Sequence, residues 1–283
     1  MIIIDLNQVM ISNFMAQVGA HTNIEINEGL FRHMVLNQIR SLRTKFNDYG
    51  EVIIACDDKK SWRRDVFPYY KASRRKDRQK SEIDWPTVFN SLSAIKAELK
   101  EFFPYRVIQV EGAEADDVIG TLCHKFGNII NTGEQILILS GDKDFAQLHV
   151  YGNVKQFDPV RKKHIKHADP LKFTRELIFK GDRGDGIPNI LSEDNVLADG
   201  IRQRPVRLAR FSAISDPGSE LEGEELRGWK RNEMLIDLAF TPQNIQDQIM
   251  SIYDSEAGKD RSKLFNYFVS KKLTSLVEQI SEF

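Results

Sequence analysis

The sequence predicts an α/β fold with a mainly parallel central sheet flanked by helices, followed by a helical C-terminal region. Short apolar runs, each of a length that suits a buried strand, alternate with helical periodicity over residues 1–140. Carboxylates stand at the ends of these runs, as Asp5 and Asp57 do. After about residue 169 only helical periodicity continues. With 283 residues and 41% hydrophobic content, the chain can form one large domain or two smaller ones.

The elements of the first half follow from their periodicity and their end signals. Residues 28–46 have amphipathic spacing, and Asp84 can cap a helix that carries Pro86 in its first turn. Residues 7–27 show no clean period. We expect strands over residues 1–6, 51–56, 105–110 and 135–140, helices over 28–46, 84–102 and 114–126, and a hairpin of 153–157 with 163–165.

The second half is expected to be helical. The change of pattern divides the chain into an α/β core, residues 1–168, and a helical region, residues 169–283. The core includes a basic segment at about residues 59–84. We expect helices over residues 170–180, 205–214, 222–240, 242–253, 262–270 and 274–280.

Composition and cysteine use indicate a protein of the cytosol. Only two cysteines are present, Cys56 and Cys123, and each lies within an apolar run, so no disulfide framework is expected. The first residues do not resemble a secretory signal, and no apolar run approaches the ~20 residues that a membrane helix needs. We therefore expect a cytoplasmic location and no membrane association.

Positive charge is concentrated in one segment, although the net charge is only −1. Residues 59–80 contain ten basic side chains against Asp65 and Asp77, and residues 72–82 have almost no apolar side chain to pack. Such a segment fits a polyanion partner such as nucleic acid, although a solvated charged loop explains the same composition. We expect residues 72–82 to be mobile until they meet a partner.

Five chain segments bring acidic side chains to an expected strand end or an adjacent turn. Oxygen ligands suit hard divalent cations such as Mg²⁺ or Mn²⁺, and no grouping of histidines and cysteines indicates zinc. Turn or helix-capping chemistry explains each cluster taken alone, but five clusters together favour a functional metal site. The residues are Asp5, Asp57, Glu114 with Asp116, Asp142 with Asp144, and Asp182 with Asp185.

The charge balance supports a nucleic-acid substrate. Removing these eight carboxylates changes the net charge of the chain from −1 to +7. An acidic pit within a basic surface suits phosphodiester hydrolysis, in which two ions ~3.5–4 Å apart activate water and stabilise the attacking and leaving oxygens. The basic segment would supply salt-dependent phosphate contacts.

The motifs also occur in a recognisable order, which covers nearly the whole chain. They are Asp5, Trp62-Arg63, Tyr70-Lys71-Ala72-Ser73-Arg74, Glu114-Ala115-Asp116-Asp117, Ser140-Gly141-Asp142-Lys143-Asp144-Phe145 and Gly181-Asp182-Arg183-Gly184-Asp185. This order resembles the 5′-nuclease superfamily of flap endonucleases and 5′–3′ exonucleases, which has a PIN-like nuclease core. Within it the chain is most similar to the ribonuclease H branch of the T-even phages, up to Tyr267-Phe268-Val269 and Ser281-Glu282-Phe283.

The resemblance implies roles for the matching residues. The eight acidic residues would hold two Mg²⁺ ions, for which Mn²⁺ can substitute, directly or through water. Asp117 also matches, but on a helix it points away from Asp116, so we rank it as a secondary candidate. Arg63 and Lys71 match basic residues that the family places near the scissile phosphate, where cations stabilise developing charge. Nucleic-acid contacts are expected from Arg64, Arg74, Arg75, Lys76, Arg78, Arg204 and Arg207.

The sequence departs from the family pattern after Asp185. The family usually continues with Asn-Ile-Pro-Gly and a glycine-rich helix–turn–helix that grips duplex DNA. This chain has Gly186-Ile187-Pro188-Asn189, and residues 190–204 lack the glycine spacing. Backbone amides bind phosphate well where glycine permits close approach. Arginine side chains, including Arg202 and Arg210, can replace those contacts.

The resemblance implies a magnesium-dependent 5′–3′ exonuclease and flap endonuclease with ribonuclease H activity. Its role would be to remove RNA primers during phage-type lagging-strand replication. Expected substrates are RNA–DNA hybrids, 5′-flaps and nicked or forked duplex DNA, with a single-strand-binding protein as a further partner. We expect a monomer, in the host-cell cytosol if the chain is phage-encoded.

Two other functions compete with this one. A non-catalytic binder of branched DNA with the same fold would be expected to have lost carboxylates, and none of the motif carboxylates is lost here. A phosphohydrolase with Asp5 as its nucleophile would need a second acid two residues later, where this chain has Asn7.

Overall fold

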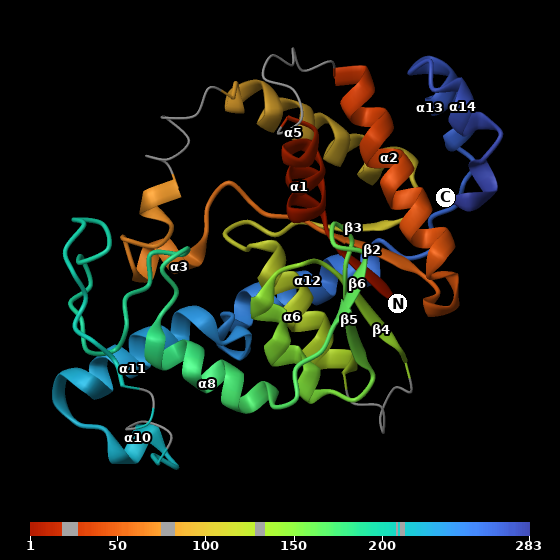
Figure 1. Cartoon of the computed structure of the whole chain (residues 1–283). Helices are drawn as coiled ribbons and strands as arrows, with labels where there is room; N and C mark the ends of the chain where they lie inside the picture. The colour runs from red at the N-terminus through yellow and green to blue at the C-terminus, as the bar shows by residue number, and fades with distance from the viewer. Residues whose placement is uncertain (19–27, 75–82, 128–133, 208, 210–212) are drawn as a thin grey trace.

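The computed structural model describes residues 1–18, 28–74, 83–127, 134–207, 209 and 213–283, and it confirms the α/β fold (Figure 1). Within these residues six strands form one sheet in the order β3-β2-β1-β4-β5-β6. Neighbouring strands are parallel except β5 and β6, which form the expected antiparallel hairpin. The strands are β1 (Ile2–Asp5), β2 (Val52–Ala55), β3 (Arg106–Ile108), β4 (Ile136–Leu139), β5 (Val154–Asp158) and β6 (Lys163–Ile165).

Strand β1 lies at the centre of the sheet, between β2 and β4. Its side chains from Ile2 to Ile4 are fully buried, because helices cover both faces of a parallel sheet and an apolar run need not alternate. From β1 the chain builds the sheet first toward β3 and then, on the other side, toward β6. The carboxyl ends of β1 and β4 therefore flank a topological switch point, which is where α/β proteins bind ligands.

Helices cover both faces of the sheet (Figure 1). One face packs through Ile2, Ile4 and alternate residues of the other strands, and the opposite face packs through Ile3 and its neighbours. The first layer consists of α1 (Leu6–Val18), α2 (Glu28–Lys45), α5 (Trp85–Phe102), α13 (Leu264–Ser270) and α14 (Thr274–Val277). The second consists of α6 (Ala115–Phe126), the 3-10 helix η3 (Leu238–Phe240) and α12 (Gln243–Ser255).

A third apolar cluster joins the C-terminal helices to the segment after β2. Phe67 and Tyr70 of that segment share this cluster with Phe179 of α8 (Pro170–Lys180) and Trp229 of α11 (Gly223–Ile236). The helical region is thus packed against the part of the core from which the basic segment starts. The remaining short elements are η1 (Asn47–Tyr49), α3 (Trp62–Val66), η2 (Lys143–Val150), α10 (Pro217–Glu220) and η4 (Ile280–Glu282).

Several expected element boundaries need correction. Helix α1 occupies residues for which no period was expected. Residues 205–207 of the helix expected over 205–214 are not helical, and most of the remaining range lies outside the described residues. Helix α14 ends at Val277 rather than at residue 280. Among the described helices, none is both long and apolar enough to cross a membrane.

Candidate functional site

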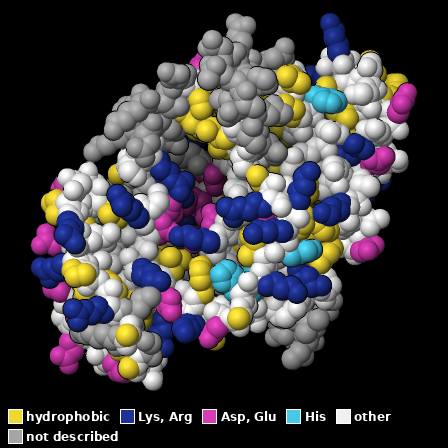
Figure 2. Space-filling model, in the orientation of Figure 1, with side chains coloured by type: hydrophobic (Ala, Val, Ile, Leu, Met, Phe, Trp, Pro, Cys, Tyr) yellow, Lys and Arg dark blue, Asp and Glu magenta, His cyan; other side chains and the backbone are white. Residues whose placement is uncertain are grey.

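The acidic residues gather at the carboxyl edge of the sheet, beside the switch point. Asp5 is the last residue of β1, Asp57 follows β2, and Asp142 follows β4. Glu114 caps the amino terminus of α6. Figure 2 shows acidic side chains in a hollow of the surface, with Lys and Arg side chains around it. The sheet therefore brings together carboxylates that are far apart in the sequence.

Asp5, at the end of the central strand β1, is buried, with 5% of its surface exposed. It accepts hydrogen bonds from the backbone amide of Gln8 at 3.1 Å and from the Ser140 hydroxyl at 3.2 Å. These bonds do not offset its surroundings: burial, and next the charge of Asp57, raise the pKa of Asp5 to about 7. A carboxylate held here carries a charge that its own protein leaves uncompensated.

Asp116 and Asp144 also have raised pKa values. Burial raises the pKa of Asp116 well above its ordinary value, and Asp142 and Asp5 add to the shift while Lys71 opposes it. Burial, followed by the charges of Asp142 and Asp182, raises the pKa of Asp144 to about 7. The buried Oδ1 atom of Asp144 has no hydrogen-bond partner among the described residues. We call Asp5, Asp116 and Asp144 the uncompensated carboxylates.

Neutral hydrogen-bond donors orient Asp57 and Asp142. Asp57 accepts from the Asn7 amide and from the backbone amide of Ala115, each at 2.7 Å. Asp142 accepts from the backbone amide of Asp144 at 2.9 Å, and its own amide donates to the Ser140 hydroxyl at 3.1 Å. Dipoles of the protein therefore fix the directions in which these two carboxylates point.

Three further carboxylates are bound by cations of the protein itself, and we call them the cation-paired carboxylates. Glu114 lies 2.8 Å from the Lys71 ammonium and accepts from the Tyr70 hydroxyl at 2.7 Å. Asp182 lies 2.5 Å from the Lys143 ammonium, and Asp185 pairs with Arg74. Burial alone would raise the pKa of Glu114 and Asp182, but these cations reverse the direction and hold both pKa values below their usual range.

Arg63 is buried behind the acidic residues. Only 2% of its side chain is exposed, and its guanidinium pairs with the fully buried Asp117 at 2.9 Å and donates to the carbonyl of Leu235 at 2.9 Å. Asp117 also accepts from the Trp62 ring and the Thr241 hydroxyl. The Arg63 guanidinium also lies 3.5 Å from Glu114, so Arg63 is buried beside the acidic residues rather than exposed in the hollow. Its partner Asp117 also accepts from the backbone amide of Glu114 at 2.8 Å, so it acts as part of the cap of α6.

The donor set fits hard divalent cations. The acidic side chains that gather in the hollow offer oxygen, which is the donor that Mg²⁺ and Mn²⁺ prefer. The three uncompensated carboxylates and the unpartnered buried Oδ1 atom of Asp144 fit a divalent cation, which would offset their charge. Within the described ranges, however, no three His, Cys, Asp or Glu side chains already converge tightly enough to hold one ion. Bound water or small shifts of the side chains must complete each coordination shell.

Comparison with known proteins identifies the family. Residues 1–177 match the model of the 5′–3′ exonuclease, N-terminal resolvase-like domain, and residues 173–283 match that of the T4 RNase H C-terminal region. The chain is 34% identical to the ribonuclease H of Enterobacteria phage T4 over 99% of this chain and 95% of that protein. The chain belongs to the 5′-nuclease family. It is a nuclease of the ribonuclease H and 5′–3′ exonuclease type.

More distant 5′-nucleases share the fold and part of the sequence. The 5′–3′ exonuclease of Buchnera aphidicola is 26% identical over 78% of this chain and 74% of that protein. A crystal structure of the T5 protein with metal ions aligns with a TM-score of 0.61 at 19% identity, over 91% of this chain and 99% of that one. A T5 flap endonuclease variant in a pseudo-enzyme-product complex with DNA and metal ions aligns with a TM-score of 0.62 at 20% identity, with the same coverage.

The predicted nucleic-acid contacts of this 5′-nuclease are distributed around the hollow. Arg64 lines a cavity of about 380 Å³ together with Lys71 and Arg74, next to Asp57 and Glu114. Exposed Arg204 and Arg207 lie in the non-helical stretch after Gly200, and Arg202 lines a second cavity of about 770 Å³ with Arg74 and Arg183. Arg75, Lys76, Arg78 and Arg210 lie outside the described residues.

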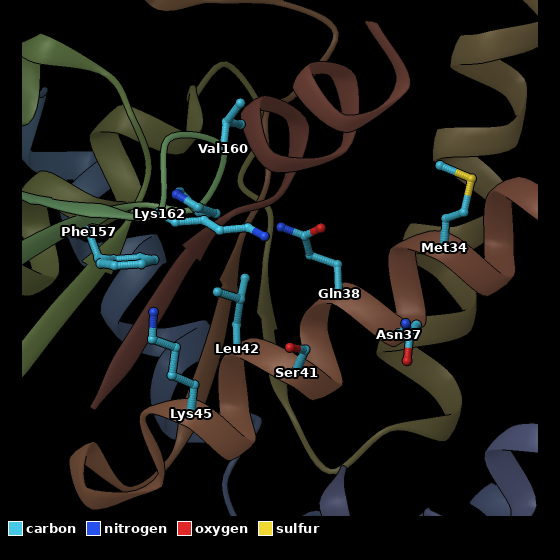
Figure 3. A pocket seen from close by; sticks show the side chains of 10 residues that line it. Met34, Asn37, Gln38, Ser41, Leu42, Lys45, Phe157, Val160 and Lys162 are labelled. Carbon is cyan, nitrogen blue, oxygen red and sulfur yellow. The ribbon is translucent and has the colours of Figure 1, made fainter. Parts of the chain in front are cut away.

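A second basic surface was missed in the sequence. The β5–β6 hairpin carries exposed Arg161, Lys162, Lys163 and Lys166, and among these four only Arg161 forms an ion pair within the described part of the chain, at 3.8 Å to Asp158. The hairpin adjoins the hollow that holds the acidic residues, because Asp158 packs directly against Gly141, which precedes Asp142. Figure 3 shows that Lys162 of this hairpin and Lys45 of α2 line one cavity of about 630 Å³. Four basic residues within 161–166 were the signal in the sequence.

Proposed function

We propose that this 5′-nuclease hydrolyses phosphodiester bonds with two Mg²⁺ ions, for which Mn²⁺ can substitute. The observation that carries the proposal is the set of uncompensated carboxylates, Asp5, Asp116 and Asp144, around Asp142. With pKa values of about 7, Asp5 and Asp144 are partly protonated near neutral pH, and burial raises the pKa of Asp116 in the same direction, so a divalent cation that replaces these protons is strongly favoured. When bound, the ions supply activated water and stabilise the attacking and leaving oxygens.

The carboxylates divide between two ion positions. Asp142 interacts electrostatically with Asp5 and Asp116 on one side and with Asp144 on the other. Asp144 in turn interacts electrostatically with Asp182 and Asp185. We assign Asp5, Asp57, Glu114 and Asp116 to one ion, Asp144, Asp182 and Asp185 to the other, and Asp142 to the space between them.

Lys71 is the residue that we propose for direct stabilisation of the transition state. Its ammonium lies between Glu114 at 2.8 Å and Asp185 at 3.7 Å, and it lines the cavity next to Asp57. A cation at this place can contact the phosphate on which charge develops. Arg63 acts indirectly: through its pair with Asp117 it fixes the amino terminus of α6, which carries Glu114 and Asp116.

The proposed substrates are RNA–DNA hybrids, 5′-flaps and nicked or forked duplexes, bound by the basic surfaces on both sides of the crevice. The T4 relative is a ribonuclease H, and the T5 relative was crystallised with DNA and metal ions. We propose primer removal in phage-type lagging-strand replication as the role, in the host cytosol, by a monomer that meets a single-strand-binding protein. Residues 169–283 would contribute duplex binding, and residues of about 59–84 would enclose the 5′ strand.

An end-labelled RNA–DNA flap substrate tests the proposal. With Mg²⁺ we expect cleavage near the flap junction and at the 5′ end, and with EDTA none. Asp142→Ala should abolish cleavage, while Asp254→Ala, an exposed acid on α12, should cleave as the wild type does. Undiminished cleavage by Asp142→Ala would refute the metal assignment. Tight flap binding by the wild type without cleavage would favour a non-catalytic branched-DNA binder.

A further inference from the structure

Helix α11 connects three carboxylate-bearing segments that otherwise belong to separate parts of the chain. Its carboxyl end contacts the core behind Glu114 and Asp144, and its middle contacts the turn that carries Asp182 and Asp185. The contacts are made by buried polar side chains and backbone groups, which are directional and therefore set positions rather than merely fill space.

At the carboxyl end of α11, two side chains from the core hold the same short stretch of backbone. Arg63 donates to the Leu235 carbonyl at 2.9 Å. Gln147 donates to the Ile236 carbonyl at 3.2 Å and accepts from the Leu238 amide at 2.9 Å. The same Gln147 amide donates to the carbonyl of Asp144 itself at 2.9 Å. Gln147 thus binds the backbone of a proposed metal ligand to the end of α11.

In the middle of α11, two consecutive residues hold the turn on the other side of the site. Asn232, which is fully buried, donates to the carbonyls of Ile178 at 2.7 Å and Pro188 at 2.8 Å. Arg231 donates to the carbonyls of Pro188 at 2.9 Å and Asn189 at 3.0 Å. These carbonyls flank the turn of Asp182 and Asp185, whose backbone closes on itself through the Asp182–Ile187 bridge.

The packing leaves α11 little freedom to move independently of these segments. A side-chain carbon at Gly228 would lie 2.1 Å from the Ile190 carbonyl oxygen, so the helix touches the backbone after the turn directly. At the other end, a side-chain carbon at Gly120 of α6 would lie 2.8 Å from Leu238. Close-packed elements of this kind transmit displacements rather than absorb them.

We propose that α11 is a positioning element for the two-ion site, and that Gln147 and Asn232 are positioning residues for cleavage. The inference rests on the proposed metal-dependent nuclease function. Asp182 and Asp185, which we assign to the second ion, lie in the turn. A displacement of this turn moves α11, and α11 moves the backbone of Asp144 through Gln147. The ligands of the two ions are thereby kept in register with one another.

Two variants and a chemically matched control test the inference. Gln147→Leu and Asn232→Leu remove the amides at the two ends of the connection. Asn153→Leu is the control, because the Asn153 amide also bridges two backbone carbonyls in the core, those of Phe126 and Glu134. It precedes β5 and so lies at the edge of the sheet opposite to the site. All three variants should unfold at lower temperature than the wild type, since each leaves buried carbonyls unpaired.

The kinetic constants separate positioning from stability. At a temperature well below every Tm, we expect Gln147→Leu and Asn232→Leu to lower kcat by about ten- to a hundredfold, with KM for the flap substrate nearly unchanged. Titration calorimetry of the substrate-free protein should show Mg²⁺ affinity lowered about tenfold. Asn153→Leu should change neither. Values of kcat and Mg²⁺ affinity equal to those of Asn153→Leu would overturn the inference.

The double variant tests whether the two ends act through one element. If α11 transmits the effect, Gln147→Leu combined with Asn232→Leu should lower kcat by clearly less than the product of the single losses. A loss equal to the product would show that the two residues act independently and would overturn the coupling. If the wild type fails to cleave, the proposed function is refuted. If the wild type cleaves and Gln147→Leu and Asn232→Leu have the same kcat and Mg²⁺ affinity as Asn153→Leu, only the present inference is refuted.

Discussion

The two kinds of carboxylate in this site differ in what compensates their charge. The cation-paired carboxylates, Glu114, Asp182 and Asp185, each contact a lysine or arginine of the same chain. The uncompensated carboxylates are buried and lie near other acids. Both conditions raise their pKa values. The first set is neutralised by cations of the same chain, whereas no lysine or arginine pairs with the second set among the described residues. On the proposed function, this asymmetry distinguishes the carboxylates that would bind the ions from those that the protein cations already hold.

The largest expected effect is on Asp144, and it has opposite signs for activity and stability. Asp144→Asn removes a proposed ligand, so cleavage should fall by about a hundred- to a thousandfold, as when other groups that stabilise a transition state are removed. The same change removes a buried charge that other acids repel, so Tm of the metal-free protein should rise. The measurements are flap cleavage and calorimetry in EDTA, with Asp254→Asn as a control. A lower Tm for Asp144→Asn would contradict the uncompensated state of this acid.

The next effect concerns Lys71, the cation that pairs with Glu114. Lys71→Met keeps an apolar stem but removes the ammonium, and we expect kcat to fall about a hundredfold, since a positioned charge acts mainly on the transition state. The Kd for flap DNA in Ca²⁺ should change little by comparison. Lys125→Met, which alters an exposed lysine at the far end of α6, controls for loss of positive charge. Equal losses in kcat and affinity would refute a transition-state role for Lys71.

A moderate effect is expected on the pH dependence of stability without metal. Asp5 and Asp144 have pKa values of about 7 in the folded protein and about 4 when unfolded. The folded state therefore binds more protons between these values, so the free energy of unfolding should fall as pH rises from about 4 to about 7. Thermal unfolding in EDTA across this range, repeated with saturating Mg²⁺, measures it.

The contrast with metal sharpens this prediction. Mg²⁺ should reverse the loss at the upper end of the range, because binding to the folded state alone stabilises it. Asp144→Asn should show a shallower decline than the wild type in EDTA. A Tm that rises between about pH 5 and pH 7 in EDTA would mean that the carboxylates are compensated after all.

The smallest effect is expected at the β5–β6 hairpin, which lies outside the acidic site. Arg161→Ala with Lys163→Ala should weaken flap binding several-fold and make binding less dependent on salt, by about one unit of slope for each phosphate that these side chains neutralise. Turnover at saturating substrate should be unchanged. The measurement is the Kd for flap DNA from low to moderate salt concentration, with Lys125→Ala as the control. An unchanged slope would exclude the hairpin from the nucleic-acid surface.

Much of the fold was predictable because local pattern and tertiary environment agree. Strand β1 has a continuous apolar run, and helix α5 has its cap, since the Asp84 side chain accepts from the Thr87 amide. Helix α1 was missed for a local reason. Assigning Leu6 to the preceding strand concealed the helical spacing of Leu6 with Val9, Met10 and Phe14, all of which are buried.

Other features depend on contacts that periodicity does not contain. The residues just before the helix expected over 205–214 are tied to Asn189 and Ser192: the Gln203 side chain accepts from the Asn189 amide, and the Arg204 amide donates to the Ser192 hydroxyl. Burial of Arg63 likewise depends on Asp117, a partner 54 residues away. Motif order identified the carboxylates, but it could not distinguish acids that protein cations neutralise from acids that are left uncompensated.

The backbone of Lys71 shows what the chain tolerates in order to place one ammonium. Its φ is +53°, a left-handed conformation that costs a lysine about 1–2 kcal/mol and glycine almost nothing. The Lys71 amide donates to the Asp185 carbonyl at 2.7 Å, which holds the residue in that conformation. Attempts to make this nuclease more robust would therefore be drawn to a glycine at position 71, where a gain in thermal tolerance would be obtained by discarding the ammonium that we propose for stabilisation of the transition state.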